Sequence, residues 1–139
     1  MKVKIKKTHK DAVIPRYSKD GDAGMDLTAV SVTGTEKYIE YSTGLAFEIP
    51  KGYVGMIYPR SSVTNTDMML KNCVGIIDSG FRGVVTARFA KTRNGMDCYK
   101  VGDRVAQIII MPYPEIEFEE SDSLEETERG DGGYGSSGQ

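Results

Sequence analysis

Glycine and proline divide this chain into short segments that are rich in β-branched and aromatic residues. Sixteen glycines and five prolines are distributed over its 139 residues. Between these breaks, residues 53–58, 83–89 and 104–110 have the composition of β-strands. This pattern is typical of an all-β domain, and the sequence predicts that fold class.

Turn signals indicate where the predicted strands reverse. Asn94 and Gly95 together form the strongest two-residue signal for a β-hairpin, and residues 50–52 predict a second turn. At most one short helix fits the sequence, within residues 61–70. A serine or threonine could cap its start, and residues 68–70 could pack against the core.

The length of the chain and the distribution of its apolar residues predict one domain followed by a tail. A chain of 139 residues has the size of a single domain, which buries roughly two-thirds of the surface of its unfolded chain. After residue 120 the apolar content falls, and Asp, Glu, Gly and Ser predominate. We therefore expect a folded domain over residues 1–120 and a mobile C-terminal arm over residues 121–139.

Composition argues against a membrane or secreted protein. Hydrophobic residues make up 39% of the chain, and the mean hydropathy is −0.37. No apolar run approaches the ~20 residues that a transmembrane helix needs. The first ten residues alternate lysine with valine and isoleucine and do not form the apolar core of a signal peptide. We therefore expect a cytoplasmic protein without a membrane partner, or one inside the host cell if it is encoded by a virus or phage.

The supply of reactive side chains restricts the chemistry. Cys73 and Cys98 are too few for a disulfide framework and lack the spacing of metal ligands. His9 is the single histidine, which argues against a zinc site and against a Ser-His-Asp relay. Catalysis must therefore use carboxylates, arginines and backbone groups.

Charge is concentrated at the two ends of the chain. The first ten residues contain five lysines and no acid, whereas residues 115–128 contain eight acids and no base. Residues 2–6 and 115–119 both alternate charged and apolar residues, so they could pair as strands within one chain or between copies. Two independent solvated faces are an equally good interpretation. Neither end interleaves basic and aromatic residues, so no direct nucleic-acid partner is expected.

Residues 59–62 carry groups that hold phosphate oxygens. Arg60 supplies a guanidinium fork, Ser61 and Ser62 supply hydroxyls, and a helix beginning here would add free backbone N–H groups. Taken alone, these four residues fit a surface turn that begins a helix better than a ligand site.

Residues 72–83 combine an apolar strand, an acid and a Ser-Gly turn. This order predicts a tight β-hairpin with Asp78 at its edge. The carboxylate there could act as a general base on a bound water, or it could cap the turn. Gly75, Gly80 and Gly83 would let a flat ligand approach backbone groups closely.

The C-terminal residues 129–138 combine five glycines with an arginine, an aromatic residue and two hydroxyls. Such an arm could close over a polyphosphate through its backbone N–H groups, with Arg129 and Tyr134 as the additional contacts. It lacks the Gly-Lys-Ser/Thr sequence of a Walker P-loop. A disordered tail is an equally good interpretation of this composition.

Two further segments, residues 22–27 and 102–107, each place a carboxylate at the edge of an apolar strand. Each acid alone fits a turn or an ion pair. Taken together, the carboxylates, Arg60, Arg129 and Gln107 indicate a phosphoanhydride ligand that carries Mg²⁺.

These five segments resemble, in order and spacing, the five motifs of the homotrimeric dUTP pyrophosphatases (dUTPases). The resemblance extends over nearly the whole chain. It implies a jelly-roll-like β-barrel that assembles as a homotrimer. It also implies that each active site takes the first, second and fourth motifs from one subunit, the third from another and the arm from the remaining one.

The resemblance further implies hydrolysis of dUTP to dUMP and pyrophosphate, which limits uracil incorporation into DNA and supplies dUMP for dTMP synthesis. Asp78 would be the general base for water that attacks the α-phosphorus. Mg²⁺ would be held by the phosphates, with Asp26 contacting its waters. The implied substrate-binding residues are Arg60, Ser61, Ser62, Asn72, Gly75, Ile76, Ile77, Phe81, Gln107, Arg129, Gly132, Gly133, Tyr134, Gly135, Ser136 and Ser137.

The chain departs from the family pattern in two motifs. Gly80 and Phe81 stand where the family commonly has an acid and a tyrosine, and Tyr134 stands where it commonly has phenylalanine. Ser136 and Ser137 replace a Ser-Thr pair.

Two alternative functions stay open beside this resemblance. A dCTP deaminase of the same fold would use a glutamate base, and a non-catalytic trimeric binding protein would tolerate loss of Asp78. A regulatory protein partner beside catalysis stays open.

Overall fold

The computed structural model describes residues 1–93 and 97–133. It contains ten strands and one short 3₁₀ helix over the described residues. The elements are β1 (Lys4–Lys7), β2 (Met25–Thr28), β3 (Ser31–Gly34), β4 (Ile39–Ser42), β5 (Leu45–Glu48), β6 (Tyr53–Tyr58), η1 (Ser61–Asn65), β7 (Met68–Leu70), β8 (Gly75–Ile77), β9 (Thr86–Lys91) and β10 (Arg104–Pro112). The prediction of an all-β domain is confirmed.

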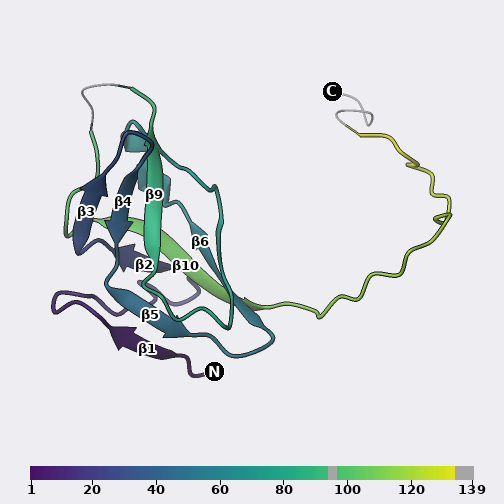
Figure 1. Cartoon of the computed structure of the whole chain (residues 1–139), viewed down its shortest axis with the longest axis horizontal. Coiled ribbons are helices and arrows are strands. Elements are labelled where there is room, and N and C mark those ends of the chain that lie inside the picture. Colours follow the sequence, from purple (N-terminus) through teal and green to yellow (C-terminus); the bar gives the residue numbers. More distant parts are fainter. Residues whose placement is uncertain (94–96, 134–139) are drawn as a thin grey trace.

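The strands form two four-stranded antiparallel sheets and a two-stranded one. One large sheet has the order β2-β10-β6-β8, the other has the order β3-β4-β9-β7, and β1 pairs with β5. Figure 1 shows β3, β4 and β9 in one layer, with β2, β10 and β6 in a second layer behind it. The two layers enclose one core, and this is the jelly-roll-like β-barrel that the sequence motifs imply.

The core follows from the two-residue period of the strands. In β4, Ile39 and Tyr41 are buried while their neighbours are half-buried. From the facing sheet, Leu27 and Ile108 are fully buried and pack into the same cluster. Alternate side chains of a strand point to opposite faces, so each sheet contributes one apolar face to the barrel interior.

Three sequence predictions match the observed strands and turns closely. The segment 53–58 is β6, and 104–110 lies within β10. The turn at residues 50–52 is present, since the Tyr53 N–H donates to the Pro50 carbonyl at 3.1 Å. The strand predicted over residues 83–89 is β9, which begins later, at Thr86. The predicted hairpin turn at Asn94 and Gly95 lies outside the described residues.

Of the residues 61–70 that could hold one short helix, only the first half is helical. Only η1 forms, and it has no side-chain cap hydrogen bond. Residues 68–70 form β7, which pairs with β9. Met68 and Leu70 are 5% and 3% exposed whereas Met69 is 58% exposed. The three residues therefore fit the alternation of a strand and not one face of a helix.

The predicted hairpin over residues 72–83 is also not a hairpin. β8 pairs with β6, and no described strand follows Asp78 to pair with β8. The next strand, β9, belongs to the other large sheet. The Ser-Gly turn does form, because the Phe81 N–H donates to the Asp78 carbonyl at 3.0 Å.

Pairing of residues 2–6 with 115–119 within one chain is wrong. β1 pairs with β5, where Lys4 lies opposite Glu48. The Lys4 ammonium donates to the Glu48 carboxylate at 3.0 Å, and this hydrogen bond lowers the pKa of Glu48. Residues 113–131 are all exposed, contain no strand, and extend away from the barrel in a long arc (Figure 1). Over the described residues, no helix is long and apolar enough to cross a membrane.

Tyr41 anchors the centre of the barrel. Its side chain is fully buried and its ring meets Phe89 edge-on, with 5.7 Å between ring centroids. Its hydroxyl donates to the Tyr99 carbonyl at 2.8 Å. Burial, with smaller contributions from Cys98 and Asp103, raises the pKa of Tyr41 to about 12.

This raised pKa predicts a loss of stability in alkali. The unfolded state releases the phenolic proton near pH 10, whereas the folded state holds it to about pH 12. The unfolded state therefore binds fewer protons in that window, and unfolding becomes easier as the pH rises. We expect Tyr41 to account for about 1 kcal/mol of lost stability at pH 11. Urea unfolding at pH 9 and pH 11 should show a larger loss for the wild type than for Tyr41→Phe. Equal losses would contradict this role for Tyr41.

Candidate functional site

A cavity of about 340 Å³ is lined by residues of the first, second and fourth motifs. We call it the arginine cavity. It is lined by Arg16, Ser18, Asp22, Ala23, Gly24, Asp26, Arg60, Arg104 and Gln107. Strand register assembles it, because Gln107 of β10 lies opposite Asp26 of β2 on one side and Tyr58 of β6 on the other. The lining contains three arginines and two aspartates, so its charge favours an anion.

Asp26 holds two of the three arginines that line the cavity. Arg60 Nε donates to Asp26 Oδ1 at 2.5 Å, and Arg104 Nη1 donates to Oδ2 at 3.1 Å. Arg60 Nη1 also donates to Ser62 Oγ at 2.9 Å. The guanidinium of Arg60 is thus held from two sides and is oriented before any ligand arrives. Ser61 is exposed beside this cluster at the start of η1.

Gln107 is fixed by the backbone around it. Its amide Nε2 donates to the Pro59 carbonyl at 2.9 Å. A Cβ atom at Gly24 would overlap the Gln107 amide oxygen. Glycine is therefore needed at position 24 so that the Gln107 side chain can lie against the backbone of the first motif.

Asp78 carries an exposed carboxylate beside the turn that follows β8. Among the described residues, its side chain makes no hydrogen bond or ion pair, and the turn uses only its backbone carbonyl. The alternative that the side chain caps the turn therefore finds no support.

Phe81 is 42% exposed, and its ring lies over Gly83. A Cβ atom at Gly83 would be 2.5 Å from Phe81 Cζ.

Asp78 and the arginine cavity lie at opposite ends of β6. Ile77 pairs with Gly55 near the start of β6. Asp78 is the next residue, so it also lies near the start of β6. Arg60 lies two residues beyond the last residue of β6. At ~3.3 Å per residue, the two positions are roughly 20 Å apart along the strand. One chain therefore does not bring the predicted base to the predicted phosphate groups.

The other predicted residues of the third motif lie along β8 and the turn before it. Gly75 is buried against Ile57, while Ile77 is half-buried and Ile76 is exposed. Asn72 lines a different cavity, of about 450 Å³. The remaining lining residues of that cavity are Lys37, Tyr38, Lys71, Thr86 and Arg88.

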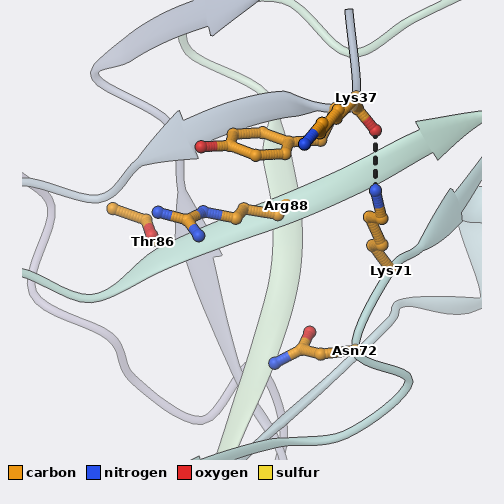
Figure 2. A pocket seen from close by; sticks show the side chains of 6 residues that line it. Lys37, Lys71, Asn72, Thr86 and Arg88 are labelled. Carbon is orange, nitrogen blue, oxygen red and sulfur yellow. Dashed lines mark hydrogen bonds between the residues drawn. The ribbon is translucent and has the colours of Figure 1, made fainter. Parts of the chain in front are cut away.

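The guanidinium carbon of Arg88 lies 4.6 Å from the centroid of the Tyr38 ring. The Lys71 ammonium donates to the Lys37 carbonyl at 2.9 Å (Figure 2). Arg88 Nε donates to Glu40 at 2.5 Å, and this hydrogen bond raises the pKa of Arg88. Two of the cations that line this cavity, Lys71 and Arg88, thus already have partners within the chain.

Residues 121–131 of the arm are exposed, and no described residue of the arm lines either cavity. Arg129 Nε donates to the Gly132 carbonyl at 2.9 Å, which closes a local turn. Gly133 is exposed. The predicted contacts Tyr134, Gly135, Ser136 and Ser137 lie outside the described residues.

The donor set suits a magnesium ion only if phosphate oxygens supply most of its ligands. The described residues contain no group of three or more His, Cys, Asp or Glu side chains placed to hold a metal. Asp26 already accepts hydrogen bonds from Arg60 and Arg104. Mg²⁺ keeps several waters and binds through few carboxylates, so Asp26 fits a contact through water and not direct coordination.

Sequence reasoning missed several lining residues and Tyr99. Arg16, Ser18 and Arg104 join the cavity through the loop before β2 and the register of β10, which no local pattern reveals. Asp22 is a turn acid that accepts from the Lys19 N–H at 2.8 Å. The hydroxyl of Tyr99 lies 3.1 Å from Ser62 Oγ, and no motif signals that contact.

Comparison with known proteins agrees with the arrangement of the motifs. The dUTPase family model matches residues 10–138. The deoxyuridine 5'-triphosphate nucleotidohydrolase of Escherichia phage T5 is 37% identical, and the match covers 98% of each chain. The corresponding protein of Finegoldia magna is 40% identical, with 99% of each chain covered.

Solved structures give the same result. The dUTPase of Staphylococcus bacteriophage 80alpha with dUPNHPP has a TM-score of 0.82 and 26% identity, and the match covers 99% of each chain. Because the family model spans most of the sequence and the relatives match it from end to end, the chain belongs to the dUTPase family.

Proposed function

We propose that this chain hydrolyses dUTP to dUMP and pyrophosphate, in a homotrimer whose active sites combine residues of different subunits. Family membership and the names of the relatives support the reaction. The observation that carries the proposal is the arginine cavity, which suits the triphosphate. This activity would limit uracil incorporation into DNA and supply dUMP for dTMP synthesis.

The arginine cavity binds the phosphate chain. Arg60 is oriented by Asp26 and Ser62, and Arg104 lies beside it. Ser61, Ser62 and Gln107 add polar groups, and Arg129 adds a further cation when residues 121–139 close over the site. Donors that are oriented before the reaction are worth ~3–4 kcal/mol each in the transition state. Mg²⁺, when bound to the phosphates, neutralises part of their charge.

Asp78 is the general base. Its exposed carboxylate has no partner among the described residues, so it is free to accept a proton from water. Water so activated attacks the α-phosphorus, and pyrophosphate leaves. Because Asp78 lies roughly 20 Å from Arg60 in one chain, the base comes from a neighbouring subunit.

Residues 72–81 select the nucleobase of the substrate. Backbone groups near Asn72, Gly75, Ile76 and Ile77 offer uracil its pairing pattern, and Phe81 packs against the deoxyribose. Cytosine inverts that pattern and would leave buried polar groups unpaired, which can discriminate by ~10⁴–10⁵. Thymine has the same pairing pattern as uracil, so it must be excluded by a clash between its methyl group and a rigid part of the site.

A substrate panel tests this proposal. The purified chain is incubated with dUTP, dCTP, dTTP or UTP in the presence of Mg²⁺, and the release of pyrophosphate and of ammonia is measured. We expect release from dUTP alone. Ammonia release from dCTP would favour a deaminase, and no reaction with any substrate would favour a binding protein.

An unpaired strand edge supports the homotrimer. Among the described strands, β1 pairs only with β5. Beside β1 lies a largely apolar groove of about 250 Å³ whose lining includes Val3, Ile5 and Phe47. The segment 115–119 carries Ile116 and Phe118, which are 61% and 93% exposed. We infer that this segment of a second copy adds to β1, with its glutamates opposite the lysines.

The assembly is therefore expected to have a mass near three times 15.3 kDa by light scattering. Replacing both Ile116 and Phe118 by aspartate should dissociate it, since each buried side chain contributes about 2 kcal/mol. Leu124→Asp is the matched control, because Leu124 lies in the same exposed stretch, residues 113–131, and is 89% exposed. A fully active wild-type monomer would contradict the shared site.

A further inference from the structure

Tyr99 connects the barrel core to the arginine cavity. Its ring packs edge-on against Tyr41 and Phe89, with centroid distances of 6.2 Å and 5.8 Å. Its backbone carbonyl accepts the Tyr41 hydroxyl at 2.8 Å. The residue is half-buried, and its hydroxyl reaches out of the core to Ser62. The position of that hydroxyl is therefore set by the packing of the core.

Two polar groups of the protein contact Ser62 Oγ. Arg60 Nη1 donates to it at 2.9 Å, and the Tyr99 hydroxyl lies 3.1 Å away. Arginine can only donate, so one lone pair of Ser62 is committed to Arg60. A phenol is more acidic than an alcohol, so Tyr99 is the better donor of the two hydroxyls.

With Tyr99 donating, both lone pairs of Ser62 are occupied and its single hydrogen has no acceptor in this cluster. The Ser62 hydroxyl can then only donate outward. We propose that Tyr99 is a positioning residue that sets Ser62 as a hydrogen-bond donor to a phosphate oxygen. This inference rests on the proposed function, in which Ser62 contacts the phosphates.

The role differs from simple packing because it acts through a single oxygen atom. Tyr99→Phe keeps the ring against Tyr41 and Phe89 and removes only the hydroxyl. Ser62 then regains a free lone pair and its hydrogen loses its fixed direction. Phosphate binding should weaken, whereas the chemical step at Asp78 should change little.

A double-mutant cycle tests the inference. Binding of inorganic pyrophosphate is measured by calorimetry for the wild type, Tyr99→Phe, Ser62→Ala and the double variant, together with kcat and KM for dUTP. We expect Tyr99→Phe to weaken pyrophosphate binding about fivefold and to raise KM by a similar factor, with kcat nearly constant. In the Ser62→Ala background the same change should have no further effect.

Tyr53→Phe is the matched control. Tyr53 also packs against the core, and among the described residues its hydroxyl makes no hydrogen bond. Unchanged pyrophosphate affinity in Tyr99→Phe, or an equal loss in both Ser62 backgrounds, would overturn the inference. So would a wild type that binds no pyrophosphate. If wild type binds pyrophosphate with the expected coupling but does not hydrolyse dUTP, the role of Tyr99 stands and the proposed function fails.

Discussion

Replacing Asp78 by asparagine should lower kcat for dUTP by about 10³-fold, within the range that general-base catalysis contributes. The amide has the shape of the carboxylate but cannot accept a proton from water. Binding should persist, because the groups proposed to hold the phosphates, such as Arg60 and Gln107, are untouched. The turn also persists, since it depends on the backbone carbonyl of Asp78 and not on its side chain.

The measurements are kcat by pyrophosphate release and the affinity for dUPNHPP by calorimetry. Asp20→Asn is the matched control, because Asp20 is an exposed aspartate outside the proposed site. Its kcat should equal that of the wild type. A clean preparation of Asp78→Asn that retains more than a few per cent of wild-type kcat would remove Asp78 from the role of base.

Deleting residues 129–139 should leave the barrel and its assembly intact and lower kcat/KM by about 10²-fold or more. Among the described residues of this segment, 129–131 and 133 are exposed, and none belongs to the core cluster. A segment with so many glycines cannot bury enough apolar surface to offset its ordering entropy. We therefore expect the arm to order on the ligand, with Arg129 on the terminal phosphate and Tyr134 over the base. Closure would also exclude water from the phosphates.

The comparison needs melting temperature, mass and dUTP hydrolysis for the full-length and truncated chains. Removal of Gln139 alone serves as the control and should change none of them. If the truncated chain keeps its kcat/KM within a factor of a few, the arm is a passive tail. Arg129 and Tyr134 would then be excluded from the site.

Local sequence patterns predicted the elements whose identity depends on their own residues. The segment 53–58 reads as a strand and is one, because β-branched and aromatic side chains between turn signals leave few alternatives. Residues 68–70 fit a helix as well as a strand, because three consecutive apolar residues match either period. Only the pairing of β7 with β9 decides between the two.

The site was predictable in its residue types but not in its contacts. Arg60, Asp26 and Gln107 meet in one cavity because β10 lies between β2 and β6, and that order joins segments far apart in the sequence. The hairpin at residues 72–83 failed for the same reason, since β8 takes its partner from earlier in the chain. The contact of Tyr99 with Ser62 likewise depends on how the core packs.

The position of Asp78 and Arg60 at opposite ends of β6 has a genetic consequence in the proposed trimer. A chain that lacks Asp78 still lends its arginine cavity to one site, and a chain that lacks Arg60 still lends its base to another. Random mixing of two such inactive chains in equal amounts would restore about a quarter of the sites. Two damaged alleles could therefore complement each other within one assembly. When one allele is damaged and the other is intact, a damaged chain would also impair sites to which an intact chain contributes.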